Sequence, residues 1–146
     1  MTKRINIQAV EPAGYKAMIG LEIYLQNSKL TKIQKELIKI RASQINGCAF
    51  CINMHTRDAL AAGETSQRIF LLNAWRETDL FDEAEKIILA MTEEITQISQ
   101  SGLTSETYSR ASELFDPETI AQIIMAIVTI NGWNRIAIST HLEIEK

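Results

Sequence analysis

The sequence predicts an all-α protein that folds as a single domain over residues 1–146. No segment between turn signals shows the alternation of apolar and polar residues that is typical of a β-strand, whereas apolar residues recur at steps of three and four, as on one face of a helix. Helix-start and helix-stop residues divide the chain at short intervals, and no linker, low-complexity tract or repeat interrupts it. We therefore expect helices packed antiparallel in one domain.

The first two predicted helices occupy roughly the first third of the chain. One begins at Pro12, because proline is favoured in a first helical turn, and ends near residues 27–28. The next begins after Thr31, which forms a capping-box pattern with Gln34, and closes before Gly47. Their apolar faces consist of Tyr15, Met18, Leu21 and Leu25 in the first helix and Ile33, Leu37 and Ile40 in the second.

The chain's only two cysteines lie at the start of the third predicted helix. This helix runs from about Cys48 to Ala62 and stops at Gly63. The Asn46-Gly47 break comes just ahead of it, which places Cys48 in a first helical turn. Glu36 borders the apolar stripe of the preceding helix.

Two further helices are predicted in the middle of the chain. Thr65 or Ser66 caps a short one, with Ile69, Leu72 and Trp75 on its apolar side. Asp82 and Glu85 form a second capping box, which opens the clearest amphipathic helix, and its pattern ends at Gly102. One face of that helix carries Ala84, Ile87, Ile88, Met91, Ile95 and Ile98.

The last third of the chain contains a short helical segment and a long apolar helix. Tyr108, Ala111 and Phe115 mark the short segment. Asp116-Pro117, a cap followed by a first-turn proline, then opens a helix that extends to about Thr140. Because this helix is apolar on more than one side, we expect it to be buried, either centrally or against another subunit.

Composition and charge exclude several classes of function. The net charge is −3 and no run of five or more like charges occurs, which argues against a nucleic-acid surface. The N-terminal residues do not match a secretory signal, and no uninterrupted apolar stretch is long enough to span a membrane. We therefore expect a cytoplasmic protein, in which a pair of thiols is usually catalytic, redox-sensing or metal-binding.

Cys48, Cys51, His55 and Glu36 form the candidate active centre. Thiols three residues apart can close a disulfide, and His55, four residues after Cys51, lies on the same helical face. A thiol reacts as its thiolate, which a helix N-terminus and a neighbouring imidazole both favour. Glu36 is placed to orient His55 or to accept its proton if the two helices pack antiparallel.

The helix dipole favours Cys48 as the attacking thiol, whereas proximity to His55 favours Cys51. A direct contact with a base should outweigh a surface dipole effect of about 0.3 to 1 kcal/mol. We therefore predict that Cys51 attacks a peroxide and becomes a sulfenic acid, that Cys48 condenses with it, and that an external dithiol reduces the disulfide.

Other interpretations of the cysteines stay open at this stage. Two buried structural cysteines are common in proteins. A zinc site could use Cys48, Cys51 and His55, with Glu36 or His141 as the fourth ligand. Covalent haem attachment is excluded, because histidine would have to follow the second cysteine directly. His141 is otherwise expected to be an exposed residue, and Trp75 and Trp133 to be core or subunit contacts.

The spacing of these residues matches a family pattern: Glu36, eleven residues, Cys48-x-x-Cys51, three residues and His55. With the segments 43–48, 61–64, 73–77 and 130–137, it resembles the alkylhydroperoxidase D (AhpD)-like core of the carboxymuconolactone decarboxylase family over nearly the whole chain. Members with the best-defined peroxidase activity carry a second histidine just before the later cysteine. Phe50 stands at that position here.

The resemblance implies an all-helical fold, trimers or hexamers, and thiol-dependent reduction of peroxides. It implies a lipoyl- or thioredoxin-type reductant and a proton relay through Glu36 and His55. Our leading interpretation is a cytoplasmic peroxidase or disulfide reductase that uses Cys48 and Cys51, with no metal or organic cofactor. Two alternatives remain: a lyase acting on a small lactone acid, which needs no thiol pair, and a non-catalytic sensor whose disulfide changes its assembly state.

Overall fold

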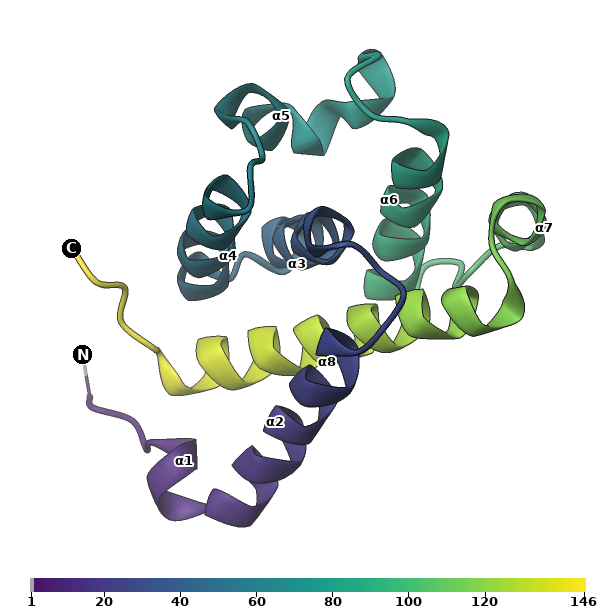
Figure 1. Cartoon of the computed structure of the whole chain (residues 1–146). Helices are drawn as coiled ribbons and strands as arrows, with labels where there is room; N and C mark the ends of the chain where they lie inside the picture. Colours follow the sequence, from purple (N-terminus) through teal and green to yellow (C-terminus); the bar gives the residue numbers. More distant parts are fainter. Residues whose placement is uncertain (1) are drawn as a thin grey trace.

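A computed structural model of the chain describes residues 2–146, and within them every regular element is helical, which confirms the predicted fold class. Figure 1 shows α8 running across the molecule with α3 lying over it, α4 and α6 on either side of α3, and α1 and α2 extending from the other side of α8. The elements are α1 (Ile7–Val10), α2 (Pro12–Gln26), α3 (Lys32–Asn46), α4 (Ala49–Ala61), α5 (Ser66–Phe70), the 3₁₀ helix η1 (Leu72–Glu77), α6 (Glu83–Thr96), α7 (Ser105–Leu114) and α8 (Pro117–Thr140).

Helix α3 is the central element, because it packs against α4, α6 and α8 and contributes to two hydrophobic clusters. Ile38 and Ala42 join the larger cluster, which α6 and α8 dominate and which contains both cysteines. Leu37 and Ile40 join the smaller cluster, beneath α5 and η1. The single apolar stripe predicted for this helix therefore covered only one of its two buried faces.

Helix α8 forms the floor of the larger cluster. Ile123, Ile127 and Ile130 are completely buried, whereas Val128 and Ile138 are 48% and 41% exposed. By length and composition α8 is also a candidate membrane span, the one such helix within residues 2–146. Enclosure of its isoleucines by α3, α6 and α2 identifies it as the core helix of this fold.

The predicted caps are confirmed. Thr31 with Gln34 and Asp82 with Glu85 form complete capping boxes, in which each partner's side chain binds the other's backbone amide. Asp116 caps α8 through the amide of Thr119, and Pro117 occupies the first turn. Helix starts were predictable because capping is a local interaction between residues three apart.

The structure corrects three expectations about the elements. The apolar pattern predicted to end at Gly102 stops earlier, since α6 ends at Thr96 and Ile98 is 61% exposed. The short helix predicted around Ile69 to Trp75 is divided into α5 and η1, with Ala74 in a non-helical conformation. Helix α1 was not expected, and no residue within it is buried.

Candidate functional site

The turn between α3 and α4 places the cysteines. Gly47 adopts a left-handed conformation with φ of 69°, which lets α3 end, and the amide of Cys48 donates to the carbonyl of Ser43 at 2.9 Å. Cys48 is the N-cap of α4, one position before the first turn in which it was expected. Its sulfur accepts a hydrogen bond from the amide of Cys51 at 3.4 Å. Both sulfurs thus lie in the partial positive field of a helix N-terminus.

Cys48 and Cys51 are joined as a disulfide, with their Cα atoms 5.4 Å apart. Their exposed fractions are only 1% and 2%. The expectation that these thiols can close a disulfide is confirmed. Because both cysteines are buried where α4 packs against α8, only a partner that enters a hollow of the fold can reach either sulfur.

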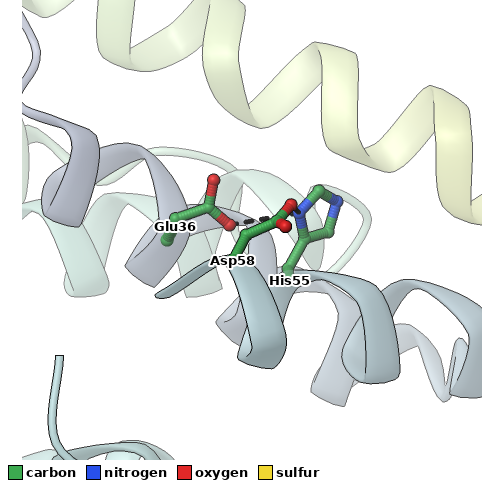
Figure 2. Close-up of side chains that lie close together, drawn as sticks. All are labelled: Glu36, His55 and Asp58. Carbon is green, nitrogen blue, oxygen red and sulfur yellow. Dashed lines mark hydrogen bonds and ion pairs between the residues drawn. The ribbon is translucent and has the colours of Figure 1, made fainter. Parts of the chain in front are cut away.

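Glu36 and His55 form a buried carboxylate–imidazole pair that joins α3 to α4. The Nδ1 atom of His55 lies 3.1 Å from Oε2 of Glu36, and the residues are 5% and 0% exposed. Figure 2 shows the two side chains pointing toward each other, with Asp58 beside them. Glu36, which the sequence placed only at the border of an apolar stripe, is therefore completely enclosed.

The charge of Glu36 is maintained by its neighbours. Burial by itself raises the pKa of this carboxyl group, but hydrogen bonds from His55 and from Nζ of Lys32 at 2.9 Å outweigh burial, so its pKa lies below the ordinary 4.5. Lys39 is a further cation 4.0 Å from Oε1. At neutral pH the group is a carboxylate, which can only accept hydrogen bonds.

An ionised Glu36 fixes the tautomer of His55. Nδ1 must carry the hydrogen that it donates to Glu36, and Oδ2 of Asp58 lies 3.7 Å from the same nitrogen. In Figure 2 the other ring nitrogen points away from Glu36. The neutral ring therefore presents Nε2 as a proton acceptor on its far side.

Cys51 and His55 line one pocket of about 420 Å³ between α2, α4 and α8. Most of its lining is apolar, and Tyr15 meets Trp133 edge-on with ring centroids 5.4 Å apart. Charged groups gather on one side, where Glu22 accepts from Lys39 and from Nε1 of Trp133. The other lining residues are Ile19, Gln26, Phe50, Met54, Asp58, Ile136, Ala137 and Leu142.

Sequence reasoning found the thiol pair and the imidazole–carboxylate pair but missed much of the pocket wall. Tyr15 was assigned only to an apolar face and Trp133 to core or subunit contacts, although both line the pocket. Glu22 and Lys39 gave no motif, since their pairing depends on how α2 lies beside α3. His141 is exposed, as expected, and lies outside this pocket.

A cation could be held by Glu36, His55 and Asp58, whose nearest ligand atoms all lie within 4.8 Å of one another. A hydrogen-bonded carboxylate–imidazole pair with a nearby aspartate accounts for the same geometry. The zinc set predicted as an alternative also required the thiolates of Cys48 and Cys51. In the disulfide these sulfurs are bonded to each other and are not thiolate ligands.

The all-helical fold and the cysteine pair at the start of α4 define a protein of the AhpD-like class, and comparisons with known proteins agree. Residues 12–94 match the model of the carboxymuconolactone decarboxylase family. The uncharacterized protein YdfG of Bacillus subtilis is 44% identical over 139 residues, which is 95% of each chain. The chain belongs to the carboxymuconolactone decarboxylase family.

Solved structures share the fold. A protein of unknown function from Agrobacterium tumefaciens, for which the role of the antioxidant defence protein AhpD has been suggested, superposes with a TM-score of 0.95 at 36% identity, over 99% of both chains. The debrominase Bmp8 superposes with a TM-score of 0.83 at 20% identity, over 94% of this chain and 74% of its own. At that identity the likeness to Bmp8 shows the fold alone.

Proposed function

We propose that the chain is a peroxiredoxin-type enzyme, a thiol-dependent peroxidase that cycles through the Cys48–Cys51 disulfide, with a His55–Glu36 proton relay. The observation that carries this proposal is that Cys51 shares a pocket with His55, whose Nδ1 is bound by a buried carboxylate. Residues 1–146 act as one domain, and the chemistry needs no metal or organic cofactor.

The oxidative step begins with the reduced pair. Nε2 of His55 takes the proton of Cys51, and the thiolate attacks the terminal oxygen of a hydroperoxide, whose O–O bond breaks. The departing alkoxide receives the proton back from His55 and leaves as an alcohol, while Cys51 becomes a sulfenic acid. The Cys48 thiol then attacks the Cys51 sulfur, which releases water and forms the disulfide.

The pocket supports Cys51 rather than Cys48 as the attacking thiol. The sulfur of Cys48 accepts a hydrogen bond from the backbone amide of Cys51 at the helix N-terminus. Of the two cysteines, however, only Cys51 lines the pocket together with His55. A substrate in the pocket therefore meets Cys51 first. Glu36 acts through His55, because its carboxylate holds the imidazole in the tautomer that accepts a proton.

The apolar wall supports an organic hydroperoxide as substrate in preference to hydrogen peroxide. Phe50, where related peroxidases carry a histidine, supplies apolar surface and no titratable group. Burial of a substrate's hydrocarbon against Phe50, Tyr15 and Trp133 contributes roughly 25 cal/mol per Å² of apolar area removed from water. The reductant is a dithiol of lipoyl or thioredoxin type.

The proposal extends to the protein's location, binding partners and assembly. The protein works in the cytoplasm, binds neither nucleic acid nor membranes, and assembles as a homo-oligomer, a trimer or a hexamer. Exposed apolar side chains on α2 and α8 support assembly, among them Ile23 at 54% and Val128 at 48%.

Peroxide turnover in cysteine variants tests the proposal. With cumene hydroperoxide and excess dihydrolipoamide, Cys51→Ser should lower the rate about a hundredfold or more, because serine is not ionised near neutral pH. Cys48→Ser should consume about one equivalent of peroxide quickly and accumulate a sulfenic acid on Cys51 that dimedone traps.

Unchanged peroxide consumption in Cys51→Ser would refute this function. Turnover of a lactone acid by the Cys48→Ser, Cys51→Ser double variant would favour the lyase instead. Consumption of a single equivalent by the wild type, despite excess dithiol, would favour the sensor.

A further inference from the structure

A second, smaller hollow of about 180 Å³ lies beside Cys48. It opens where the start of α4 meets the end of α8, and both Ala49 and Ile138 on its rim are exposed. The residues that line it are Gly47, Cys48, Ala49, Phe50, Ala137, Ile138, His141 and Leu142. Nothing in the peroxide chemistry proposed above uses this hollow.

The two cysteines of the disulfide line different openings. Cys51 lines the pocket with His55, and Cys48 lines only the hollow. Phe50, Ala137 and Leu142 line both and so form the wall between them. A molecule in the hollow therefore approaches the disulfide at Cys48, while the pocket still contains the substrate or its alcohol product.

Thiol–disulfide exchange has a direction that fits this division. A thiolate attacks one sulfur of a disulfide, and the other sulfur leaves with the bonding electron pair. Attack at Cys48 expels Cys51 as a thiolate beside His55, which is the form that the next peroxide requires. Attack at Cys51 would instead place the reductant in the substrate pocket. It would also release Cys48 as the thiolate, rather than the Cys51 thiolate that reacts with peroxide.

His141 is the only titratable side chain besides Cys48 among the residues that line the hollow. It is the C-cap of α8 in a left-handed conformation with φ of 53°, and the next amide, of Leu142, donates to the carbonyl of Ala137 at 3.0 Å. This turn places His141 among the residues that line the hollow. An exposed imidazole is a suitable proton acceptor for an incoming thiol.

We propose that the hollow beside Cys48 admits the thiol reductant and that His141 accepts the proton of the attacking thiol, an inference that rests on the redox cycle proposed above. The first thiol of a dithiol gives its proton to His141 and bonds to the Cys48 sulfur as Cys51 leaves. The second thiol attacks the mixed disulfide and releases Cys48. The dithiol loses two electrons and two protons and becomes a cyclic disulfide, and both cysteines are reduced.

Reduction of the disulfide and oxidation of the thiols can be measured separately, so this inference can be tested apart from the peroxidase function. The oxidised protein is mixed with dihydrolipoamide and free cysteine thiols are counted over time, while the reduced protein is mixed with cumene hydroperoxide. His141→Asn tests the base, since asparagine tolerates the left-handed conformation of His141. Ile138→Trp fills the hollow, Met54→Trp fills the pocket, and Leu114→Trp is a bulky control at an exposed position on α7, outside both.

We expect His141→Asn to slow reduction about a hundredfold, the low end of general-base effects. Ile138→Trp should lower the ratio of reduction rate to oxidation rate by about tenfold, because misplacing reacting groups by the order of 1 Å is costly. Met54→Trp should raise that ratio, and Leu114→Trp should leave it unchanged.

An unchanged ratio in Ile138→Trp together with an unchanged reduction rate in His141→Asn would overturn the inference. So would a lower ratio in Met54→Trp, which would assign the reductant to the pocket. Because diamide forms the disulfide without a peroxide, the reduction rates can be measured even if the protein has no peroxidase activity.

Discussion

Glu36 has a greater influence on the site than its place in the sequence indicates. It is completely buried, it joins α3 to α4 through His55, and Lys32 and Lys39 lie beside it. Removing one partner of a buried pair typically costs about 3 to 5 kcal/mol, because the other group is left uncompensated. The carboxylate therefore supports the fold as well as the tautomer of His55.

The depressed pKa of Glu36 predicts a stability change in acid. The pKa of Glu36 is lower in the folded than in the unfolded chain, so the unfolded chain binds the proton first as the pH falls. The stabilisation is therefore complete above about pH 4.5, and it is lost as the pH falls through the pKa of Glu36 in the folded chain. Urea unfolding of the wild type and of Glu36→Gln between neutral pH and pH 3 measures this, with the difference between them shrinking in acid. A constant difference would contradict the assignment.

At this scale the sequence predicted Cys48, Cys51, His55 and Glu36 as the site. The structure pairs Cys48 with Cys51 and His55 with Glu36, and it places Cys51 and His55 along one pocket. The spacing of Cys48, Cys51 and His55 within one helix is a local property, and Glu36 followed from the family pattern. The burial of Glu36 was not predictable from one apolar stripe, because α3 is enclosed on several sides by helices distant in the chain. The catalytic roles of these residues stay predictions.

At the scale of elements, helix starts were more predictable than helix ends. Capping residues predict where α3, α6 and α8 begin, because each capping hydrogen bond connects two residues that are three positions apart. The end of α6 depends instead on tertiary contacts. Glu94 accepts from both the amide and the hydroxyl of Thr104, which draws the chain back after Thr96 and leaves Ile98 exposed.

The division between α5 and η1 has a similar origin. Ile69, Leu72 and Trp75 all enter the smaller hydrophobic cluster, as their helical spacing predicts. Within η1 the backbone also departs from helical geometry at Ala74, where φ is −118°. Nε1 of Trp75 binds Glu93 on α6 at 2.8 Å, a contact that no local pattern encodes.

At the scale of the whole molecule, the pocket belongs to several helices at once. Its aromatic wall combines Tyr15 on α2 with Trp133 on α8, more than a hundred residues later. The sequence predicted a long apolar helix in this place, but not that its side chains would line a substrate pocket. Motifs identify the chemistry of a site, whereas the shape of the pocket depends on long-range packing.

Assembly is the prediction that belongs to the whole molecule. We expect sedimentation velocity to give a trimer or a hexamer of the 16.5 kDa chain, in both the reduced and the oxidised state. The physical reason is the apolar surface left exposed on α2 and α8. A monomer at all concentrations would contradict the proposed assembly, and a size that changes with oxidation would favour the sensor.

The most direct test of the central claim is the pH at which Cys51 forms its thiolate. Ultraviolet thiolate absorbance is titrated in Cys48→Ser, where Cys51 is the only thiol, with and without His55→Ala. The account predicts that Cys51 ionises at lower pH than a model thiol and that His55→Ala removes much of this advantage. Ionisation of Cys51 no easier than that of a model thiol, with or without His55, would contradict it.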